Sequence, residues 1–473
     1  MRFLFVFLAI FIPTAAGTWF VSWVLGKDHG ASFFERVTLG YGAGMGLVSL
    51  WIFALGMFGI PFGLAAFASA PLAALFVFIF LTRGKIAPAK RAFNLEGGRV
   101  LPSLEGNTLR GVWFYVSLFL GAWIFIKLAF VFSECFSKPF FSWDNLANWA
   151  AAAKFFYYEK GFALDPANEH FFGSGYRPYL GHPLHTTLLN VWTSVWLGEF
   201  HEIYSKSWTF FYFASLLGLF YSALKREMPS FYAVVAAFFL ASSPIITYHG
   251  QDGYADLPLG FYGLASAVCL WKFLKKGGRR FILLAGVFSG MMVFVKNEGL
   301  FLLLGVFFSI LLYSFAKRDF KAPVYFILPA AAFAAPWFLT KFIYGFGFGH
   351  GAGSGIELLK DPNVGIRAAG LYWEAIPAAL REWFLSANFN ILFAVFFASV
   401  VLGFKDALRS NVKYLLVIVA SVLSMFMFVY LTIEYIGVVQ GSGIERNTLT
   451  FAPVMAFSAA LLVHRIIAGP PKD

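Results

Sequence analysis

Residues 141–162 read FSWDNLANWAAAAKFFYYEKGF, and residues 175–192 read GYRPYLGHPLHTTLLNVW. Both stretches belong to the segment 134–203, the longest part of the chain that is too polar to lie within a bilayer. Apolar stretches precede and follow this segment. It therefore predicts a large loop between membrane spans, where the polar chemistry of the chain can gather.

The composition excludes a mainly soluble protein. Of the 473 residues, 60% are hydrophobic and 13% are charged, and the mean hydropathy is +0.73. A soluble fold of this size must expose too much surface to hide so many apolar residues. We predict a polytopic membrane protein that forms one membrane-embedded unit without a separate soluble domain. The two cysteines, Cys135 and Cys269, form neither a disulfide framework nor a pair with metal-ligand spacing.

Apolar windows of about 20 residues predict about 13 membrane spans. Only helices satisfy all backbone polar groups of an open chain in lipid, so the fold is predicted to be all-α. The two short spans around Lys296–Gly299 are expected to form a tight hairpin. The predicted spans are 3–25, 37–57, 60–82, 111–133, 204–223, 229–247, 256–274, 281–296, 299–315, 322–344, 385–403, 412–434 and 448–466.

The positions of the basic residues predict the orientation. More than half of the 36 Lys and Arg residues fall in one set of loops, and such an excess marks the cytoplasmic side. That set comprises 26–36, 83–110, 224–228, 271–280, 316–321, 404–413 and the C-terminal 464–473. The remaining loops, predicted to be extracytoplasmic, are 134–203, 248–256, 297–298, 345–384 and 435–447. The net charge of +12 is thus a topology signal, and no nucleic-acid partner is predicted.

The first half of the large loop predicts helices that lie along the membrane surface. Five residues recur at helical spacing, with Trp149 and Phe156 beside them: Trp143, Leu146, Ala150, Ala153 and Tyr157.

Ser142 is a candidate N-cap, which places Asp144 in the first turn of this helix. From local sequence, catalysis by Asp144 and simple stabilisation of the helix dipole are equally supported. Lys154 falls on another face of the helix and either meets a lipid phosphate or extends to the headgroups, and the second is favoured.

The second half of the loop offers three further candidates. Arg177, in the turn YRPY, could hold a phosphate or carboxylate, and a solvated arginine is the rival interpretation. His182 opens a second amphipathic segment, 182–196. His182 and His185 are three residues apart with no third ligand nearby, so a metal site is not favoured.

Three other outer features carry charge. In SPIITYHGQDGYADLP, residues 243–258, Pro and Gly break the helix at the headgroups and place Tyr254 and Asp256 there. Lys296 and Glu298 sit in the short hairpin, where polarity alone is a sufficient explanation. Arg446 precedes the last span on the predicted extracytoplasmic side. Positive charge is disfavoured on that side, which slightly favours a functional role for Arg446.

The acidic residues argue against an ion-coupled transporter. Within the predicted spans, Asp and Glu occur only at span ends, at Asp256 and Glu434, and no internal repeat is detected. The glycine-rich start of 345–384, GFGFGHGAGSG, follows no strand, so a flexible gate is favoured over a nucleotide site.

The order of these motifs resembles the GT-C membrane glycosyltransferases, in the branch of the protein O-mannosyltransferases and the lipid A aminoarabinose transferases. The order comprises an outer loop with an early Asp, Y-x-P-x-x-x-x-P-L, S-P-x-x-x-Y…D-x-P-L, K-x-E-G and a late Arg. WDNLANWAAAAK is also similar to a W-D-x-x-x-x-W-x-x-K-A-K pattern of bacterial members. The resemblance covers 111–466 and implies a GT-C-like bundle as a catalytic core, 111–473, after a three-span extension, 1–110.

By this resemblance Asp144 matches the catalytic base, Asp256 the second acidic residue, Lys296 the hairpin lysine and Arg446 the arginine near the donor phosphate. Arg177, Lys154, Glu298, Tyr254 and His182 are the further substrate-binding candidates. The chain departs from many mannosyltransferases at Asn145, where they have Glu, and it shows no C-terminal soluble domain.

The implied reaction transfers a sugar from a polyprenyl-phosphate donor to a lipid, glycan or protein acceptor, with inversion at the anomeric carbon. The implied location is the bacterial inner membrane, with the site on the periplasmic face and membrane lipids as partners. No cofactor is required; a divalent metal between Asp144 and Asp256 is compatible with the resemblance but not favoured. The alternatives are a transporter or flippase of a lipid-linked sugar, a non-catalytic assembly subunit, and an enzyme like the O-antigen ligases.

Overall fold

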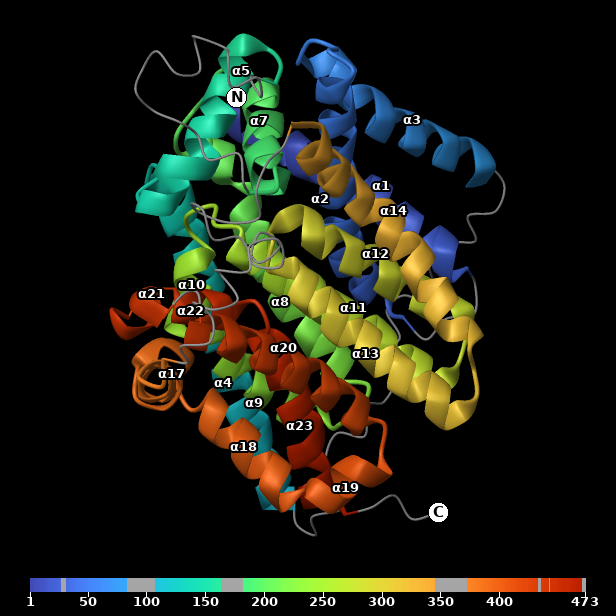
Figure 1. Ribbon diagram of the computed structural model, residues 1–473, viewed down its shortest axis with the longest axis vertical. Helices are drawn as coiled ribbons and strands as arrows, with labels where there is room; N and C mark the ends of the chain where they lie inside the picture. The colour runs from blue at the N-terminus through green and yellow to red at the C-terminus, as the bar shows by residue number, and fades with distance from the viewer. Residues whose placement is uncertain are drawn as a thin grey trace.

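The computed structural model describes residues 1–26, 31–82, 107–162, 182–344, 372–432, 435–441 and 443–469. These residues form helices and connecting segments without a β-strand, which confirms the all-α prediction (Figure 1). The helices of the first half are α1 (Arg2–Leu25), α2 (Phe33–Met57), α3 (Leu64–Thr82), α4 (Asn107–Ser137), η1 (Asn145–Ala150), α5 (Ala151–Glu159), α7 (His185–Leu197), η2 (Tyr204–Lys206), α8 (Trp208–Leu224), α9 (Ser230–Ala241) and α10 (Pro244–His249). Those of the second half are α11 (Asp256–Lys276), α12 (Arg279–Val295), α13 (Gly299–Lys317), α14 (Lys321–Tyr344), α17 (Ala375–Phe384), η3 (Ala387–Phe389), α18 (Leu392–Leu402), α19 (Phe404–Arg409), α20 (Val412–Thr432), α21 (Tyr435–Val439), α22 (Ile444–Leu449) and α23 (Ala452–Ala468).

Eight of the described helices are long and apolar enough to cross a membrane, and four further apolar helices are shorter. The protein is therefore a multi-pass membrane protein, while the count of about 13 spans stays a prediction. The predicted span 229–247 is not one continuous helix, as the Pro and Gly break in residues 243–258 predicts. It breaks into α9 and α10 at Pro244, and the Ser243 hydroxyl donates to the carbonyl of Asn388 at 2.7 Å.

Helix α11 forms the centre of the bundle, because its residues 256–273 are all buried. It packs against α8, α12, α13, α23 and α2. Small residues permit this close packing: a Cβ on Gly260 would lie 3.1 Å from the carbonyl oxygen of Leu449. Since α11 begins at Asp256, its burial brings that carboxylate inside the protein.

The N-terminal helices pack against the same core. α2 contacts α1, α7 and α8, and the buried Glu35 of α2 pairs with Lys272 of α11 at 2.6 Å. The boundary at residue 110 stays a prediction.

The helices of the large outer loop differ from the predicted surface helices. η1 is a π-helix, and α5 continues it. Trp143 and Leu146, predicted to share one face with Ala150 and Ala153, are exposed, whereas Trp149 is buried. Ala150 and Ala153 are buried with Trp149 and Phe156, so only the later half of the predicted face packs against protein, and the wider π turn separates the two halves in helical phase.

The second amphipathic segment predicted from His182 to Trp196 contains α7, which is enclosed by protein. Every residue of 185–194 is buried. Trp192 donates its indole N–H to the carbonyl of Ala9 at 2.7 Å, and His185 lies 2.7 Å from the Ser49 hydroxyl. These partners on α1 and α2 hold α7 in the core.

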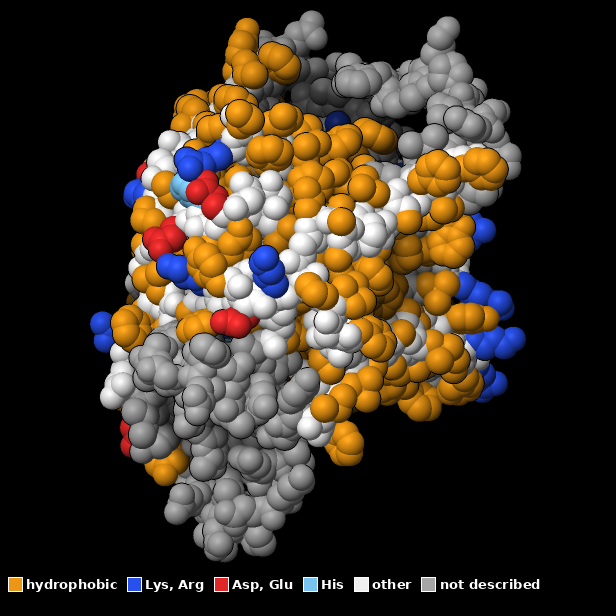
Figure 2. Space-filling model, turned by 90° about the horizontal axis from the view of Figure 1, so that it is seen from above, with side chains coloured by type: hydrophobic (Ala, Val, Ile, Leu, Met, Phe, Trp, Pro, Cys, Tyr) orange, Lys and Arg blue, Asp and Glu red, His pale blue; other side chains and the backbone are white. Residues whose placement is uncertain are grey.

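Charged side chains are distributed unevenly over the surface in the view of Figure 2. Lys and Arg gather without acidic side chains at one edge, and both signs mix at the opposite edge. Apolar side chains cover most of the surface between them. This arrangement agrees with a bundle whose two ends face different sides of a membrane.

Candidate active site

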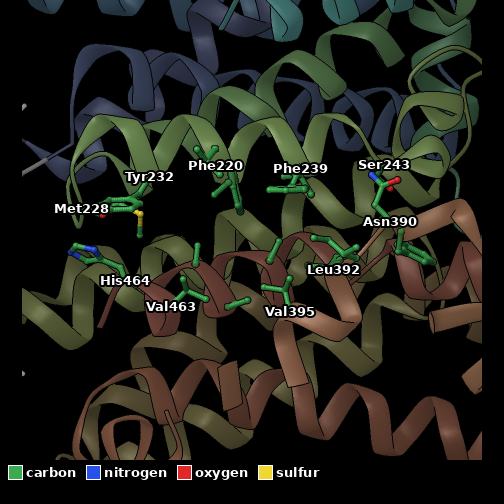
Figure 3. A pocket seen from close by; sticks show the side chains of 18 residues that line it. Phe220, Met228, Tyr232, Phe239, Ser243, Asn390, Leu392, Val395, Val463 and His464 are labelled. Atoms are coloured by element: carbon green, nitrogen blue, oxygen red, sulfur yellow. The ribbon is translucent and has the colours of Figure 1, made fainter. Parts of the chain in front are cut away.

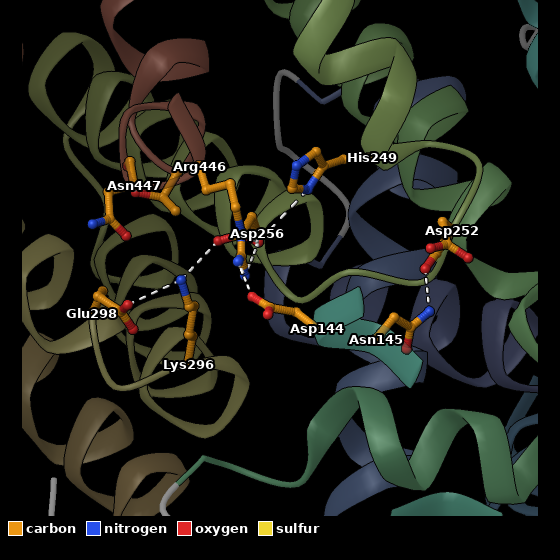
Figure 4. A network of polar contacts seen from close by, with 10 residues as sticks. Asp144, Asn145, His249, Asp252, Asp256, Lys296, Glu298, Arg446 and Asn447 are labelled. Carbon is orange, nitrogen blue, oxygen red and sulfur yellow. Dashed lines mark hydrogen bonds and ion pairs between the residues drawn. The ribbon is translucent and has the colours of Figure 1, made fainter. Parts of the chain in front are cut away.

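Asp256 is the centre of a network of charged side chains at one end of α11 (Figure 4). Its carboxylate is fully buried. The ammonium of Lys296 lies 2.8 Å from Oδ1, and Nη2 of Arg446 lies 3.4 Å from Oδ2. A buried carboxylate is tolerated when cations and hydrogen bonds compensate its lost hydration, as they do here.

Lys296 reaches the network from the predicted hairpin, which the structure shows as the turn between α12 and α13. The turn is tight because Gly299 lies directly on the backbone of Met292, where a Cβ has no room. Glu298 N-caps α13 by position and places Oε1 at 2.9 Å from the Lys296 ammonium. One cation is thus held between two carboxylates.

Arg446 joins the two aspartates on which the sequence analysis relied. It projects from the short helix α22 and pairs through Nη1 with Oδ2 of Asp144, while Nη2 and Nε face Asp256. Its guanidinium carbon also lies 4.8 Å from the ring centroid of Tyr254, a cation–π distance. Burial lowers the pKa of Arg446, but the carboxylates of Asp256 and Asp144 outweigh that effect and raise it, so the guanidinium stays charged.

His249, the last residue of α10, was not among the predicted site residues, although it stands between Pro244 and Asp256 in the broken helix. It is fully buried, its Nδ1 lies 3.6 Å from Oδ2 of Asp256, and its ring stacks on Tyr254 with centroids 4.3 Å apart. Burial lowers the pKa of His249 to about 3. The imidazole is therefore neutral beside the charged network.

Asp252, also missed from the sequence, holds the start of the outer loop. Its carboxylate accepts the backbone N–H of Ser142 at 2.7 Å and that of Phe141 at 3.2 Å, and its backbone carbonyl accepts the Asn145 amide. These contacts flank Asp144 on both sides and fix the direction of its side chain. The helix begins at Trp143, directly after Ser142, and the backbone N–H of Leu146 donates to the Ser142 carbonyl at 3.0 Å, so Asp144 lies in the first turn as predicted. The Ser142 hydroxyl itself makes no capping hydrogen bond among the described residues.

A buried lysine supports Asp252 from the next span. Lys206 is fully buried, lies 3.6 Å from the Asp252 carboxylate and donates to the carbonyl of Gln251 at 2.7 Å. No periodic pattern in the sequence indicates this pair, since Lys206 begins an apolar helix and the two residues share no local motif.

Of the other predicted residues, Tyr254 and Glu298 belong to the network and Lys154 does not. Lys154 is exposed and lies 3.7 Å from Glu202, outside the site. The rings of His182 and Trp149 have centroids 5.7 Å apart. Trp149 in turn contacts Tyr254, so the Trp149 ring lies between His182 and the network. Arg177 lies outside the described residues.

Within the described part of the chain, no three His, Cys, Asp or Glu side chains come together as a metal site would require. Asp144 and Asp256, the two carboxylates considered for a bridging metal, are engaged by Arg446.

An apolar groove runs along α9, α18 and α23 (Figure 3). Its volume is about 180 Å³, and its walls are almost entirely hydrocarbon. Met228 and His464 lie at one end, and Ser243 and Asn390 at the other. Because Ser243 directly precedes α10, the groove ends one short helix away from His249 and Asp256.

No protein-family model matches the sequence, and no curated protein matches it. Two solved structures resemble the fold, both of ArnT from Cupriavidus metallidurans. The crystal structure bound to undecaprenyl phosphate shows 11% identity and a TM-score of 0.49 over 74% of this chain and 60% of that chain. The apo crystal structure shows 13% identity and a TM-score of 0.39 over 73% of this chain and 78% of that chain. This chain thus spans 60% of the length of the first of these structures.

Proposed function

We propose that this protein is a membrane glycosyltransferase that moves a sugar from a polyprenyl-phosphate donor to a hydroxyl group outside the cytoplasm. The observation that carries the proposal is the convergence of Asp144 and Asp256, from distant parts of the chain, on one guanidinium. Lys296 completes the set at 2.8 Å from Asp256. Two cations for a leaving phosphate and a partly exposed carboxylate for an acceptor proton are what this reaction needs.

The charge balance of the network explains how it would receive a phosphate. Asp144, Asp256 and Glu298 face two cations, Arg446 and Lys296, while His249 is neutral. An incoming phosphodiester adds further negative charge, so one carboxylate must lose its ion pair with Arg446 or Lys296. Asp144 is the most exposed of the three, with 34% of its side chain accessible. We infer that the donor phosphate replaces Asp144 at Arg446.

The released Asp144 carboxylate then acts as the base. The acceptor oxygen forms a bond to the anomeric carbon and its proton passes to Asp144. The bond between that carbon and the phosphate oxygen breaks, and its electron pair leaves with the phosphate. Arg446 and Lys296 stabilise the charge that develops on the phosphate, and attack opposite the leaving group inverts the anomeric centre.

The apolar groove suits the hydrocarbon tail of such a donor. It is open along the bundle, its lining is apolar, and its end at Ser243 lies next to α10. A lipid seated there would bring its headgroup towards the network from the membrane, without passing through water.

Purified protein reconstituted in vesicles with a polyprenyl-phosphate sugar and a soluble sugar acceptor tests the proposal. We expect release of polyprenyl phosphate, slowed by about 10²–10⁴-fold in Asp144→Asn. Release should be retained in Glu199→Gln, a matched change of an exposed carboxylate that pairs with Arg2. A flippase would move the lipid without cleaving it, and a ligase of the O-antigen type would release a polyprenyl diphosphate from its own donor. Full transfer by Asp144→Asn would overturn the assignment of the base.

A further inference from the structure

A polar cavity, separate from the apolar groove, lies at the opposite end of α11 from Asp256. It has a volume of about 240 Å³, and its charged and aromatic lining consists of Arg226, Glu227, Trp271, Lys272, Lys275 and Lys276. Trp271 follows Asp256 by four helical turns, about 22 Å along the axis. We call this cavity the basic pocket. It shares no residue with the Asp256 network and is independent of the proposed function.

The basic pocket holds more positive charge than its carboxylates neutralise. The carboxylate of Glu35, which lies behind the pocket, pairs with the Lys272 ammonium at 2.6 Å and with Nε of Arg226 at 3.0 Å. The carboxylate of Glu227 pairs with the Lys275 ammonium at 2.7 Å. Four cations therefore face two carboxylates, and Lys276 is exposed at the rim. The excess positive charge favours a bound anion.

Trp271, which lines the basic pocket, carries a buried hydrogen-bond donor. Its side chain is 3% exposed, and its indole N–H is buried without an acceptor among the described residues. A buried donor without a partner is rare and unfavourable, so such a group points to a ligand oxygen. The ammonium of Lys275 lies over the same indole ring, 5.9 Å from its centroid, so the ring also faces a cation of the pocket.

A simpler explanation covers only part of these observations. Lys275 and Lys276 lie in the last turn of α11, where cations stabilise the helix dipole, and this loop belongs to the basic, predicted cytoplasmic set. That explanation accounts for neither the cavity nor the buried donor of Trp271.

We propose that the basic pocket binds a phosphate group. Phosphate oxygens accept from Lys, Arg and indole N–H donors, and basic pockets between membrane helices recognise anionic headgroups. The pocket lies between the ends of two apolar helices, α8 and α11, at the depth where a phospholipid headgroup would lie. A membrane lipid and free phosphate share this chemistry and are separated by experiment.

The test measures thermal unfolding of the full-length protein in neutral detergent during titration with short-chain phosphatidylglycerol, short-chain phosphatidylcholine or inorganic phosphate. We expect a saturable rise of the unfolding midpoint with phosphatidylglycerol. Its half-saturation should become roughly tenfold weaker in Trp271→Phe, which keeps the ring but lacks the donor, and in Lys276→Gln, whose exposed site tolerates the change. Lys317→Gln, which removes a matched cation from the last turn of α13, should leave the titration unchanged.

The titrations distinguish a site for a lipid phosphate from a site for free phosphate. If inorganic phosphate alone gives the same saturable rise, and Trp271→Phe weakens it, the pocket is a phosphate site that takes a soluble anion. Equal stabilisation by phosphatidylcholine and phosphatidylglycerol, or equal weakening by Lys317→Gln and Lys276→Gln, would overturn the proposal. Because Lys276 is exposed, its variant tests the proposal even if Trp271→Phe fails to fold.

Discussion

Asp144 and Asp256 contact the same guanidinium from different surroundings, and the proposed function gives them different roles. Asp256 is fully buried and is bound to Lys296 as well as Arg446, so its carboxylate has little freedom to accept a proton from a substrate. Asp144 is partly exposed and pairs with Arg446 from the open side. Two carboxylates with separate environments can thus divide the work, one orienting cations and one accepting the proton.

Asp144→Asn should bind the product lipid more tightly while losing transfer. The amide frees Arg446 from its charged partner and removes one negative charge from the network, so polyprenyl phosphate should bind about tenfold more tightly. Loss of a general base should lower the transfer rate by about 10²–10⁴-fold. Equilibrium binding of a fluorescent prenyl phosphate checks the first effect. Weaker binding in Asp144→Asn would contradict the exchange at Arg446.

Asp256→Asn should destabilise the protein. Removing one partner of a buried ion pair leaves Lys296 and Arg446 without full compensation, at a cost of about 3–5 kcal/mol. We expect a lower unfolding midpoint in detergent and a lower yield in the membrane. The double variant Asp256→Asn/Lys296→Met, which removes both charges, should regain most of the stability and remain inactive. An undisturbed unfolding midpoint in the single variant would show that Asp256 does not organise these cations.

His249 should make the protein sensitive to acid. Its pKa falls from the usual value near 6.5 to about 3 on folding, so below pH 6.5 the unfolded chain gains a proton that the folded chain does not. Stability is therefore lost as the pH falls from about 6.5 towards 3, by about 2 kcal/mol between pH 7 and pH 5. His249→Phe keeps a ring against Tyr254 and should reduce the drop of the unfolding midpoint between these two pH values. An identical drop in both proteins would contradict a neutral buried His249.

At the level of elements, Asp252 connects the start of the outer loop to the segment between α10 and α11. Its carboxylate holds the N–H groups of Phe141 and Ser142, just before Asp144. Asp252→Asn keeps one acceptor oxygen but leaves the buried Lys206 without its carboxylate. A small displacement of a reacting group costs up to about a hundredfold in rate.

We therefore expect Asp252→Asn to lower kcat by about 10–100-fold, with little change in the KM for the donor. The double variant Asp252→Asn/Lys206→Met restores the charge balance and should recover the protein yield without recovering kcat. If the double variant regains full kcat, Asp252 acts through stability alone and does not position Asp144.

The local structure of the site was partly predictable. Pro244 and the glycines after it mark a helix break at the membrane boundary, and Lys296–Gly299 marks a tight turn, because both patterns act through the backbone over a few residues. The inward face of the loop helix was only partly predictable. A period of 3.6 residues places Trp143 and Leu146 with Ala150, whereas the π turn brings in Trp149.

The long-range contacts of the site could not be read from the sequence. His249, Asp252 and Lys206 enter through packing between α8, α10 and α11, which no local spacing encodes. The burial of α7 has the same origin, since its partners lie on α1 and α2. Resemblance to a family located Asp144, Asp256, Lys296 and Arg446, but the residues that hold them in place required the structure.

On the scale of the whole molecule, hydrophobicity predicted an all-α membrane bundle, and the basic loops predicted its direction. Eight helices meet the length and composition of a span. Several predicted spans are shorter in the structure, because short helices such as η3 and α22 occupy the ends of the apolar windows. An apolar window measures hydrophobicity alone, so it does not separate a crossing helix from a buried break beside it.

The orientation of the bundle in the membrane can be tested by cysteine labelling, because the two native cysteines should not react. Cys135 and Cys269 are both buried, so an added exposed cysteine reports its own side of the membrane. Tyr158 is 64% exposed on the outer loop, and Lys317 is exposed in the basic, predicted cytoplasmic set. In right-side-out vesicles, a membrane-impermeant maleimide should label Tyr158→Cys at once and Lys317→Cys only after permeabilisation. The wild-type protein, as the control, should stay unlabelled in both conditions. The reverse pattern would place the Asp256 network on the cytoplasmic face, where nucleotide sugars are available, and would remove the reason for a lipid-linked donor.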